Sequence, residues 1–331
     1  MDLTQRISAF SKLGTKLSSI SEDAFEHLST QAFNSNRWFT SASVKNAFDG
    51  LSYMLEHEKL KSWLSNYDIQ TLQSKQVGIV MAGNIPLVGF HDLLCVLMSG
   101  HHAVVKTSSQ DAILPKQVIE WLIEIEPEFS QHISVIERLE NIEAVIATGS
   151  DNTARYFEYY FGKYPNIIRK NRTSVAVLNG KETDEQLLEL AKDIFDYYGL
   201  GCRNVSKLLI PEGYDIKHLL DVWQPYALML DNNKYRNNYD YNKSILLING
   251  VDHLDTGYSL LQESDQLVSP ISITYYQSFS SESELKSILD RNQDKIQCIV
   301  GNDHIPFGKA QLPDVWEYAD NVDTLKFLLS I

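Results

Sequence analysis

The sequence has few cysteines, few basic residues and no long apolar stretch. Its three cysteines show no paired spacing, which excludes a disulfide framework and a zinc motif and fits a reducing cytoplasm. It contains no run of about 18 apolar residues that would span a membrane, and residues 1–20 lack the apolar region of a signal peptide. The net charge of −14 argues against nucleic acids and anionic membranes as partners. We therefore expect a soluble, cytoplasmic protein.

The chain of 331 residues is long enough for two domains and a large core. Its 44% hydrophobic and 22% charged residues are typical of a globular protein, without repeats or low-complexity tracts. Residues 3–67 carry apolar side chains at roughly helical spacing. We expect them to form helices that pack against the rest of the chain.

From residue 77 the pattern changes to strands that alternate with helices. The expected strands are 77–81, 103–106, 133–136 and 144–147, and the expected helices are 88–98, 115–125 and 151–161. Apolar strands separated by helices predict a parallel sheet that is covered on both faces. Such sheets bind nucleotides at the carboxyl ends of their strands, although the usual G-x-G-x-x-G fingerprint is absent.

A second α/β region follows the first. The expected strands are 174–178, 205–210, 245–248, 271–276 and 296–300, and the expected helices are 184–198, 216–230 and 282–292. Thr183 with Gln186 forms a capping-box pattern before the first of these helices, and Ser281 is the expected cap of the last. Residues 231–243 are rich in Asn and Tyr and are predicted to form a polar loop.

Polar residues follow three strands of the first predicted sheet. These segments are Gly83-Asn84-Ile85-Pro86, Lys106-Thr107-Ser108-Ser109 and Thr148-Gly149-Ser150. The last segment opens a helix, whose N-terminal amides are suited to a phosphate. Each segment alone is typical of a turn or a helix cap. Together, at strand ends of one sheet, they form a candidate binding site.

Cys202 is the candidate nucleophile. Cys95 and Cys298 lie in apolar runs and are expected in the core, whereas Cys202 follows Gly201 in a predicted turn between a helix and a strand. A thiol in such a turn can attack an acyl carbon, and its own backbone N–H can donate to the resulting oxyanion. Arg203 is positioned to favour the thiolate, although the end of the preceding helix would oppose it. The alternative is that Cys202 is one more small apolar residue.

The order of these motifs resembles the aldehyde dehydrogenase superfamily. The matching segments are Gly83-Asn84-Ile85-Pro86, Val104-Val105-Lys106-Thr107-Ser108, Thr148-Gly149-Ser150, Gly201-Cys202, Ser269-Pro270 and Pro306-Phe307-Gly308. The tail, with Gly308-Lys309-Ala310-Gln311-Leu312-Pro313 and Tyr318-Ala319-Asp320-Asn321-Val322-Asp323-Thr324, is similar to the LuxC-like acyl-CoA reductases within this superfamily. The resemblance covers about residues 77–331.

The resemblance implies an aldehyde-dehydrogenase-like α/β fold with a Rossmann-like cofactor domain and a catalytic-cysteine domain. The expected division is residues 1–170 for the helices and the nicotinamide cofactor domain, 171–305 for the catalytic domain, and 306–331 for a tail that packs back on the cofactor domain. The carried-over roles are as follows: Cys202 is the nucleophile, Asn84 and the Cys202 N–H form the oxyanion hole, Lys106 binds the adenosine ribose, and Thr148, Gly149 and Ser150 lie along the cofactor phosphates.

Two departures from the family pattern bear on the reaction. Oxidising members carry a glutamate base that activates the deacylating water, but the comparable stretch, residues 169–174, holds no carboxylate. The family's glutamate at the nicotinamide ribose is replaced by Gln266, which can still bond a hydroxyl. The basic residues Arg169, Lys170 and Arg172 meet a phosphate of CoA or of the cofactor, or else form a solvated surface run.

A missing charge decides the predicted cofactor. NAD-selective relatives often place an acidic residue three positions after the ribose-binding lysine, whereas this position is Ser109, next to Ser108. Asp111 is close in sequence, but we expect it to start the following helix and to point elsewhere. The prediction is therefore NADPH, with NADH as the alternative.

The predicted function is NADPH-dependent reduction of a fatty acyl-CoA, or another acyl thioester, to the aldehyde through an acyl-Cys202 intermediate. The alternatives are aldehyde oxidation, acyl-phosphate reduction, or a catalytically silent scaffold that binds acyl chains or a partner. The family's luminescence members work beside an acyl-activating enzyme, so such a partner and a homo-oligomer are expected. No metal is expected, since the histidines show no ligand spacing.

Overall fold

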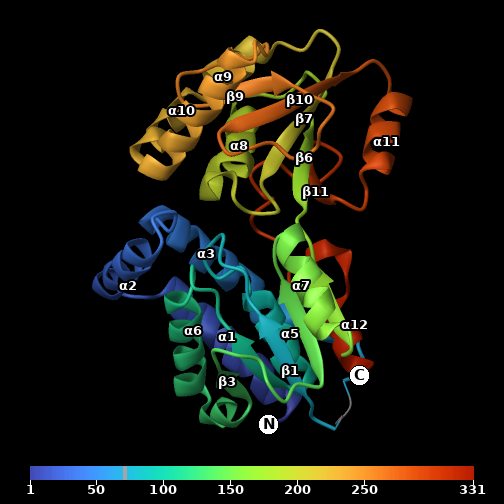
Figure 1. Ribbon diagram of the computed structural model, residues 1–331. Coiled ribbons are helices and arrows are strands. Elements are labelled where there is room, and N and C mark those ends of the chain that lie inside the picture. Colours follow the sequence, from blue (N-terminus) through green and yellow to red (C-terminus); the bar gives the residue numbers. More distant parts are fainter. Residues whose placement is uncertain (70–72) are drawn as a thin grey trace. The chain divides into compact units, whose positions relative to one another are not determined.

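The computed structural model describes residues 1–69 and 73–331 and divides the chain into two compact units. Unit 1 comprises Met1–Asn171 together with Leu312–Ile331, and unit 2 comprises Arg172–Gln311. Each unit contains a mainly parallel sheet with helices packed on it (Figure 1). The predicted α/β fold with a helical N-terminus is confirmed.

Unit 1 begins with helices, as the apolar spacing of residues 3–67 predicts. They are α1 (Leu3–Ser18), α2 (Glu22–Ser35), α3 (Ser41–Met54) and α4 (His57–Leu64). The side chains of Asp2, Ser21 and Thr40 accept hydrogen bonds from the first turns of α1, α2 and α3 and so fix where these helices start. Their apolar faces, including Phe10 and Trp63, are buried in the core of unit 1.

The sheet of unit 1 consists of parallel strands in the order β3-β2-β1-β4-β5. Their bounds are β1 (Gln76–Val80), β2 (His102–Lys106), β3 (Ile133–Val135), β4 (Ala144–Thr148) and β5 (Asn166–Arg169). The order reverses at β1, which lies between β2 and β4. In open α/β sheets the ligand crevice lies outside the carboxyl ends of the strands at such a point.

Further helices of unit 1 connect its strands, and the end of the chain completes its core. They are α5 (Phe90–Ser99), α6 (Ile113–Ile125), η1 (Pro127–Gln131), α7 (Asp151–Phe161), η4 (Ala319–Asn321) and α12 (Thr324–Leu329). Leu325 and Leu328 are fully buried in the core of this unit. The indole N–H of Trp63 donates to the Tyr318 hydroxyl at 2.7 Å.

Unit 2 has a sheet in the order β11-β6-β7-β10-β9-β8, in which only the β8–β9 pair is antiparallel among the described strands. The bounds are β6 (Thr173–Val177), β7 (Val205–Pro211), β8 (Leu254–Asp255), β9 (Leu260–Glu263), β10 (Ile273–Phe279) and β11 (Ile296–Val300). The central strands β7 and β10 are mostly buried.

The helices of unit 2 lie on both sides of its sheet, with α11 on one side and α8, α9 and α10 on the other (Figure 1). Their bounds are α8 (Asp184–Phe195), η2 (Asp196–Gly199), α9 (Ile216–Val222), η3 (Gln224–Asp231), α10 (Asn233–Ile248) and α11 (Glu282–Arg291). The capping box of Thr183 with Gln186 and the Ser281 cap are confirmed.

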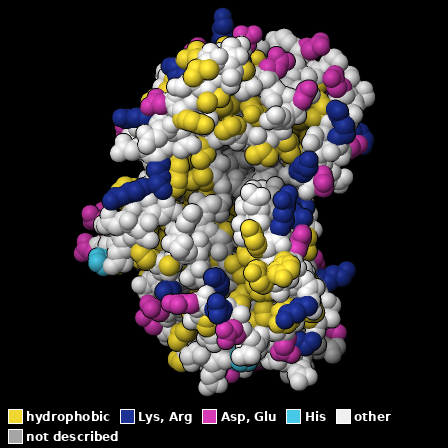
Figure 2. Space-filling model, in the orientation of Figure 1, with side chains coloured by type: hydrophobic (Ala, Val, Ile, Leu, Met, Phe, Trp, Pro, Cys, Tyr) yellow, Lys and Arg dark blue, Asp and Glu magenta, His cyan; other side chains and the backbone are white. Residues whose placement is uncertain are grey.

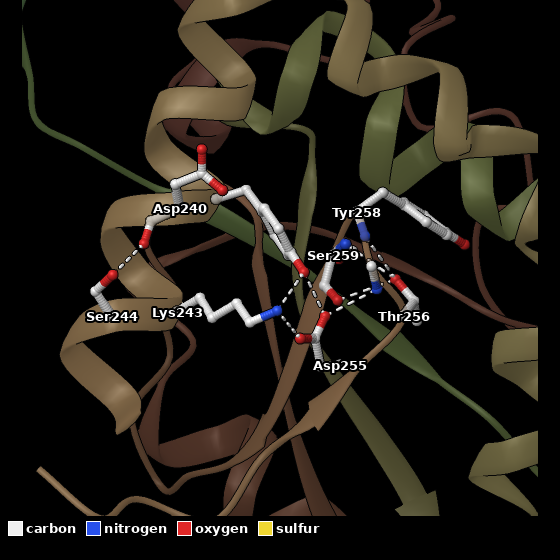
Figure 3. A network of polar contacts seen from close by, with 9 residues as sticks. Asp240, Lys243, Ser244, Asp255, Thr256, Tyr258 and Ser259 are labelled. Atoms are coloured by element: carbon white, nitrogen blue, oxygen red, sulfur yellow. Dashed lines mark hydrogen bonds and ion pairs between the residues drawn. The ribbon is translucent and has the colours of Figure 1, made fainter. Parts of the chain in front are cut away.

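The predicted loop at residues 231–243 and the predicted strand at 245–248 are wrong, because helix α10 begins at Asn233 and continues to Ile248. Asn232 caps the helix, and its buried side chains are Tyr235, Tyr239, Asn242 and Leu246, at helical spacing. Because most of these side chains carry polar atoms, the helical spacing was not recognised as an apolar pattern. The Tyr239 hydroxyl donates to Asp255 at 2.6 Å. Lys243 of the same helix forms a 2.7 Å ion pair with this carboxylate (Figure 3).

Other helix bounds also differ from the prediction. The helix expected over residues 184–198 ends at Phe195 and continues as the 3₁₀ turn η2, in which Tyr197 and Tyr198 have positive φ. The helix expected over residues 216–230 is divided into α9 and η3, since Pro225 follows Gln224 and lacks the N–H that a continuous α-helix needs. The short strands β5, β8 and β9 were not predicted.

The surface carries charges of both signs. On the face shown in Figure 2, acidic and basic side chains are interspersed. Over residues 1–69 and 73–331, the helices are all too short or too polar to cross a membrane.

Candidate active site

Cys202 is half-buried in a turn between η2 and β7, as the sequence predicts. The turn is closed by the Asn204 backbone N–H, which donates to the Gly201 carbonyl at 3.0 Å. The Asn204 side chain accepts from the Gly201 N–H at 2.8 Å. The same amide group donates to the carbonyls of Asp193 and Asp196 at 3.1 and 2.7 Å. One buried amide therefore holds the Cys202 loop, residues 199–204, against the end of α8.

This contact also changes the expected electrostatics of the Cys202 loop. The last carbonyls of a helix carry a partial negative charge, which disfavours a nearby thiolate. The Asn204 amide occupies carbonyls of this helix end and so reduces their exposed charge. Asn204 was not singled out from the sequence. The signal was a polar residue at the start of an apolar strand, directly after a glycine-flanked cysteine.

Ser174 holds the Cys202 peptide from the other side. Its hydroxyl donates to the Cys202 carbonyl at 3.0 Å and accepts from the Cys298 backbone N–H at 3.2 Å. Ser174 is fully buried on β6. The backbone on both sides of the Cys202 thiol is therefore fixed by neutral side chains.

The segment before Cys202 is strained. Tyr197, Tyr198 and Gly199 have φ values of 54°, 59° and 75°, and only the glycine adopts such angles without a steric cost. The left-handed conformation costs other residues about 1–2 kcal/mol each. Strain of this kind concentrates at functional sites. The Tyr198 ring packs against Tyr235 of α10, with ring centroids 5.8 Å apart, and this contact helps to hold the strained conformation.

A small cavity of about 30 Å³ lies next to this segment. Tyr198, Gly199, Tyr235 and Ser272 are among the residues that line it. The hydroxyls of Tyr235 and Ser272 are buried and have no hydrogen-bond partner among the described residues. The volume suits a single hydrogen-bonding group of about the size of water.

The Pro306-Phe307-Gly308 segment lies close to the Cys202 loop within unit 2. The Asp193 carboxylate accepts from the backbone N–H groups of Gly308 and Ala310 at 2.7 and 3.0 Å. Burial raises the pKa of Asp193 to about 7, although these two donors oppose the shift. The Arg203 guanidinium donates to the Ala310 carbonyl at 3.3 Å. Arg203 therefore fastens this segment to the Cys202 loop.

Gln266 is exposed in the connection after β9. Its backbone N–H donates to the Ser264 hydroxyl at 3.1 Å. The adjacent Leu267 carbonyl accepts from Ser206, near the start of β7, at 2.8 Å. The segment that carries Gln266 thus approaches the strand that follows Cys202.

In unit 1, the three predicted segments lie at one edge of the sheet. Val80 is in register with Lys106 and with Ala147, so the segments that begin with Met81, Lys106 and Thr148 leave the carboxyl ends of neighbouring strands. Asn84 and Lys106 are half-buried, and Ser109 is exposed. The structure therefore brings the predicted unit 1 residues to the edge where parallel sheets bind ligands.

Two groups of the Thr148-Gly149-Ser150 segment have structural partners. The Gly149 N–H donates to the Arg169 carbonyl at 3.4 Å. The Ser150 hydroxyl accepts from the Thr153 N–H at 3.3 Å and so caps α7. Contact of this segment with cofactor phosphates remains a prediction.

The prediction that Arg169 meets a phosphate or lies on a solvated surface is wrong. Arg169 is only 3% exposed and donates to Asp92 of α5 at 2.5 Å and to Thr324 of α12 at 2.8 Å. Asp92, a single charge in an otherwise apolar helix, was the signal for a buried partner. Lys170 forms an exposed ion pair with Glu158 at 3.0 Å, and Arg172 donates to the Ile296 carbonyl. The basic run is not one binding surface.

The expectation that Asp111 starts the next helix is wrong by two residues. Helix α6 starts at Ile113, and Asp111 is 3% exposed. Its carboxylate accepts from the backbone N–H of Leu87 at 2.7 Å, within the segment that follows Asn84. Asp111 thus serves the Asn84 loop, which we define as residues 82–89.

The described residues contain no group of three or more His, Cys, Asp or Glu side chains arranged to hold a metal ion. Burial raises the pKa of the Cys95 thiol well above its ordinary value, since that side chain is fully enclosed on α5. Cys298 is also buried. Of the three cysteines, Cys202 is the one that reaches solvent appreciably.

Comparison with solved structures defines the class of fold. Aldehyde dehydrogenase 21 from Physcomitrella patens, in complex with the product succinate, superposes with a TM-score of 0.69 over 100% of this chain and 84% of its own, at 12% identity. The NAD⁺ complex of aldehyde dehydrogenase from Bacillus cereus gives 0.61 at 14% identity, covering 91% and 72%. Aldehyde dehydrogenase C from Pseudomonas syringae, with NAD⁺ and octanal, gives 0.63 at 10% identity, covering 86% and 69%. The protein has the aldehyde dehydrogenase fold.

A family comparison is more specific. The model of the family described as acyl-CoA reductase (LuxC) matches residues 18–219. The chain belongs to this family, whose members are oxidoreductases that act on acyl groups, and the predicted relationship is confirmed. A search of curated proteins gave no match.

Proposed function

We propose that this protein reduces a fatty acyl-CoA, or a related acyl thioester, to the aldehyde with NADPH, through an acyl-Cys202 intermediate. Membership of the acyl-CoA reductase family supports the reaction class. The observation that carries the proposal is the half-buried Cys202 in a turn whose backbone is fixed by Asn204 and Ser174.

The first step is acyl transfer to the protein. The Cys202 thiolate attacks the thioester carbon, and the C–S bond to the leaving thiol then breaks, which releases CoA as a thiolate that takes up a proton. The Asn84 side-chain amide and the Cys202 backbone N–H donate to the oxyanion of the tetrahedral intermediate, which forms after attack and before CoA leaves. Fixed donors aimed at a developing charge are an effective means of catalysis, because they need no reorganisation during the reaction.

The second step needs a hydride donor, and unit 1 has features that fit a nicotinamide dinucleotide. Lys106 and Thr148 flank β1 at the point where the strand order reverses, and Ser109 is exposed beside them. Lys106 would hold the adenosine ribose, with Ser108 nearby, and Thr148, Gly149 and Ser150 would border the phosphates. Gln266 would bond the other ribose. The bound cofactor supplies the hydride that converts the thioester carbon to the aldehyde, which leaves Cys202 as a thiolate.

The direction of the reaction follows from a residue that the chain lacks. Hydrolysis of an acyl-enzyme needs a base to activate water. The residues that connect β5 to β6 include no carboxylate, and Arg169, the last residue of β5, is a buried cation. Without such a base an acyl-enzyme hydrolyses more slowly and persists until hydride transfer, which favours reduction over aldehyde oxidation.

The preference for NADPH rests on Ser109 and Asp111. Ser109 places a neutral hydroxyl where a carboxylate would repel a 2′-phosphate. The acidic residue closest to Ser109 in the sequence, Asp111, is buried and accepts a hydrogen bond from the Leu87 N–H. Lys106 adds a positive charge that favours a phosphate.

The decisive experiment follows the absorbance of NADPH with acyl-CoA substrates of increasing chain length, alongside mass spectrometry of the protein. We expect consumption of NADPH with long acyl chains, and an acyl adduct on Cys202 when the cofactor is omitted. Cofactor binding without an adduct would indicate a silent scaffold. An adduct from acyl phosphate but not from acyl-CoA would change the substrate class.

A further inference from the structure

The Asn84 loop contains a strained residue that needs an anchor. Leu87 has φ of 58°, in the left-handed region that a leucine rarely adopts. Its carbonyl accepts from the Phe90 N–H at 3.0 Å, at the start of α5, and its own N–H donates to Asp111 at 2.7 Å. Asp111 is 24 residues away in the sequence and belongs to the turn between β2 and α6.

Asp111 is an unusual anchor for a loop, because it is a buried ionisable group. Its side chain is buried, and two backbone donors face its carboxyl group, the N–H of Leu87 and the N–H of Leu114 in the first turn of α6. Burial raises the pKa of Asp111 to about 7, while the backbone N–H groups of Leu87 and Leu114 lower it. Burying a carboxyl group costs stability even where backbone donors face it. Strongly perturbed carboxyl groups cluster at functional sites.

The same turn contacts the Asn84 loop at a second point. A Cβ atom on Gly83 would lie 2.5 Å from the Ser108 hydroxyl and 3.1 Å from the Asp111 nitrogen. Gly83 therefore allows the loop to rest directly on the turn. Asn84 is held between these two contacts, at Gly83 on one side and at Leu87 on the other.

We propose that Asp111 is a positioning residue that fixes the Asn84 loop and thereby aims the Asn84 amide at the oxyanion. This proposal rests on the proposed role of Asn84. Asp111 itself does not touch the substrate. Its contribution is an oxygen acceptor at Leu87, which either protonation state of a carboxyl group, or a carboxamide, can supply.

The test uses single-turnover acylation of Cys202 by acyl-CoA, in the full-length protein, without cofactor. Asp111→Ala removes the acceptor and should lower the acylation rate constant about tenfold, with the Kd for acyl-CoA unchanged within about twofold. Asp111→Asn keeps an acceptor oxygen and should restore acylation to within about threefold of wild type. Cys95→Ala is the matched control, because it perturbs the buried core of the same unit without touching the Asp111–Leu87 contact and should acylate normally.

A double-mutant cycle distinguishes the outcomes. Because Asp111 acts through Asn84, Asp111→Ala should have little further effect on acylation in an Asn84→Ala background. If Asn84→Ala slows acylation and Asp111→Ala slows it by a further tenfold, the positioning role is refuted while the oxyanion role stands. If Asn84→Ala acylates like wild type, the proposed function of Asn84 itself fails. An Asp111→Asn protein as slow as Asp111→Ala would also overturn the proposal.

Discussion

The Asn84 loop of unit 1 leaves the carboxyl end of β1, whereas the Cys202 loop of unit 2 enters the amino end of β7. Both include or adjoin left-handed residues other than glycine. Both are also held by buried polar side chains: Asp111 holds the Asn84 loop from the turn after β2, and Asn204 within the Cys202 loop acts together with Ser174 of β6. The anchors differ in charge. Asp111 is a titratable carboxyl group, whereas Asn204 and Ser174 are neutral.

This difference has a physical reason. A carboxylate that bonded the Cys202 backbone would raise the pKa of the thiol, since negative charge disfavours a thiolate. A neutral amide fixes the same backbone without that penalty. The functional group of the Asn84 loop is a neutral amide, which does not ionise, so a charged anchor cannot change its protonation state. The two loops thus show that the charge of an anchor matters most where the anchored group itself must ionise.

The largest effect is expected when the thiol is removed from the Cys202 loop, whose anchors are neutral. Cys202→Ala should abolish acyl-CoA reduction and leave the fold intact, because the side chain is half-buried in a turn and not in the core. Reduction assays and thermal unfolding of the same sample would check both parts. Turnover near the wild-type level would refute the thioester mechanism.

The next effect concerns the group held by the carboxyl anchor. Asn84→Ala should lower kcat by roughly 10²–10³, the range for loss of one oxyanion donor. Substrate binding should change much less, because the oxyanion exists only after attack. Steady-state kinetics with a saturating acyl-CoA would measure this, and a change confined to KM would instead place Asn84 in substrate binding.

The charge difference between the anchors can be tested by pH. In the unfolded chain Asp111 ionises near 3.8, whereas in the folded protein burial raises its pKa to about 7. Between these values the folded form holds the proton, so this group's contribution to stability falls as the pH rises. Asp111→Asn should remove this loss of folding stability, because the amide does not ionise. The loss is at most about 4 kcal/mol, since each unit of pKa difference corresponds to about 1.4 kcal/mol.

Urea unfolding of wild type and Asp111→Asn at pH 5 and pH 8 would measure the effect. The variant should gain stability relative to wild type mainly at pH 8. Asp193, whose pKa burial also raises to about 7 in the presence of Asp196 and Glu189, offers an independent case in unit 2. An equal difference between variant and wild type at both pH values would contradict the buried ionisation.

A smaller effect concerns the cofactor. We expect kcat/KM to favour NADPH over NADH by about tenfold, the worth of one favourable charged contact. Ser109→Glu should erase or reverse this preference, because a carboxylate near 4 Å from a phosphate costs about 1 kcal/mol or more per charge pair. Equal use of both cofactors by wild type, or an unchanged preference in the variant, would refute the assignment of the ribose site.

The smallest effects are expected at the two buried cysteines. Cys95→Ala in unit 1 and Cys298→Ala in unit 2 should each cost about 1–2 kcal/mol of stability while turnover persists. Cys298→Ala is the stricter test of this prediction, because the Cys298 Sγ lies 3.1 Å from the Ser174 hydroxyl, which in turn donates to the Cys202 carbonyl. Chemical unfolding together with kcat would show whether that contact matters beyond packing.

Much of this architecture follows from local sequence. Apolar runs such as residues 103–106 and 144–147, and caps such as Thr183 and Ser281, predicted their elements closely, because burial and capping are local signals. Helix α10 escaped detection because the face it buries consists mainly of tyrosines and an asparagine. Such a face is recognisable only when partners like Asp255 are known.

The candidate groups were easier to find than the groups that hold them. Cys202 and Asn84 stand in recognisable motifs, and their roles stay predictions. Asn204, Ser174 and Asp111 act through contacts with residues of other elements, and only the folded chain shows those pairings. Arg169 illustrates the same limit, since its partners Asp92 and Thr324 lie far away in the sequence.

The path of the chain has a consequence for synthesis on the ribosome. Unit 2 is inserted into unit 1, whose last segment, Leu312–Ile331, supplies Thr324 to Arg169 and Tyr318 to Trp63. Domains usually fold in the order in which they emerge. In this protein the unit that begins first can be completed only after the second has emerged. Until then, the nascent chain carries an open apolar core at the positions that Leu325 and Leu328 will fill.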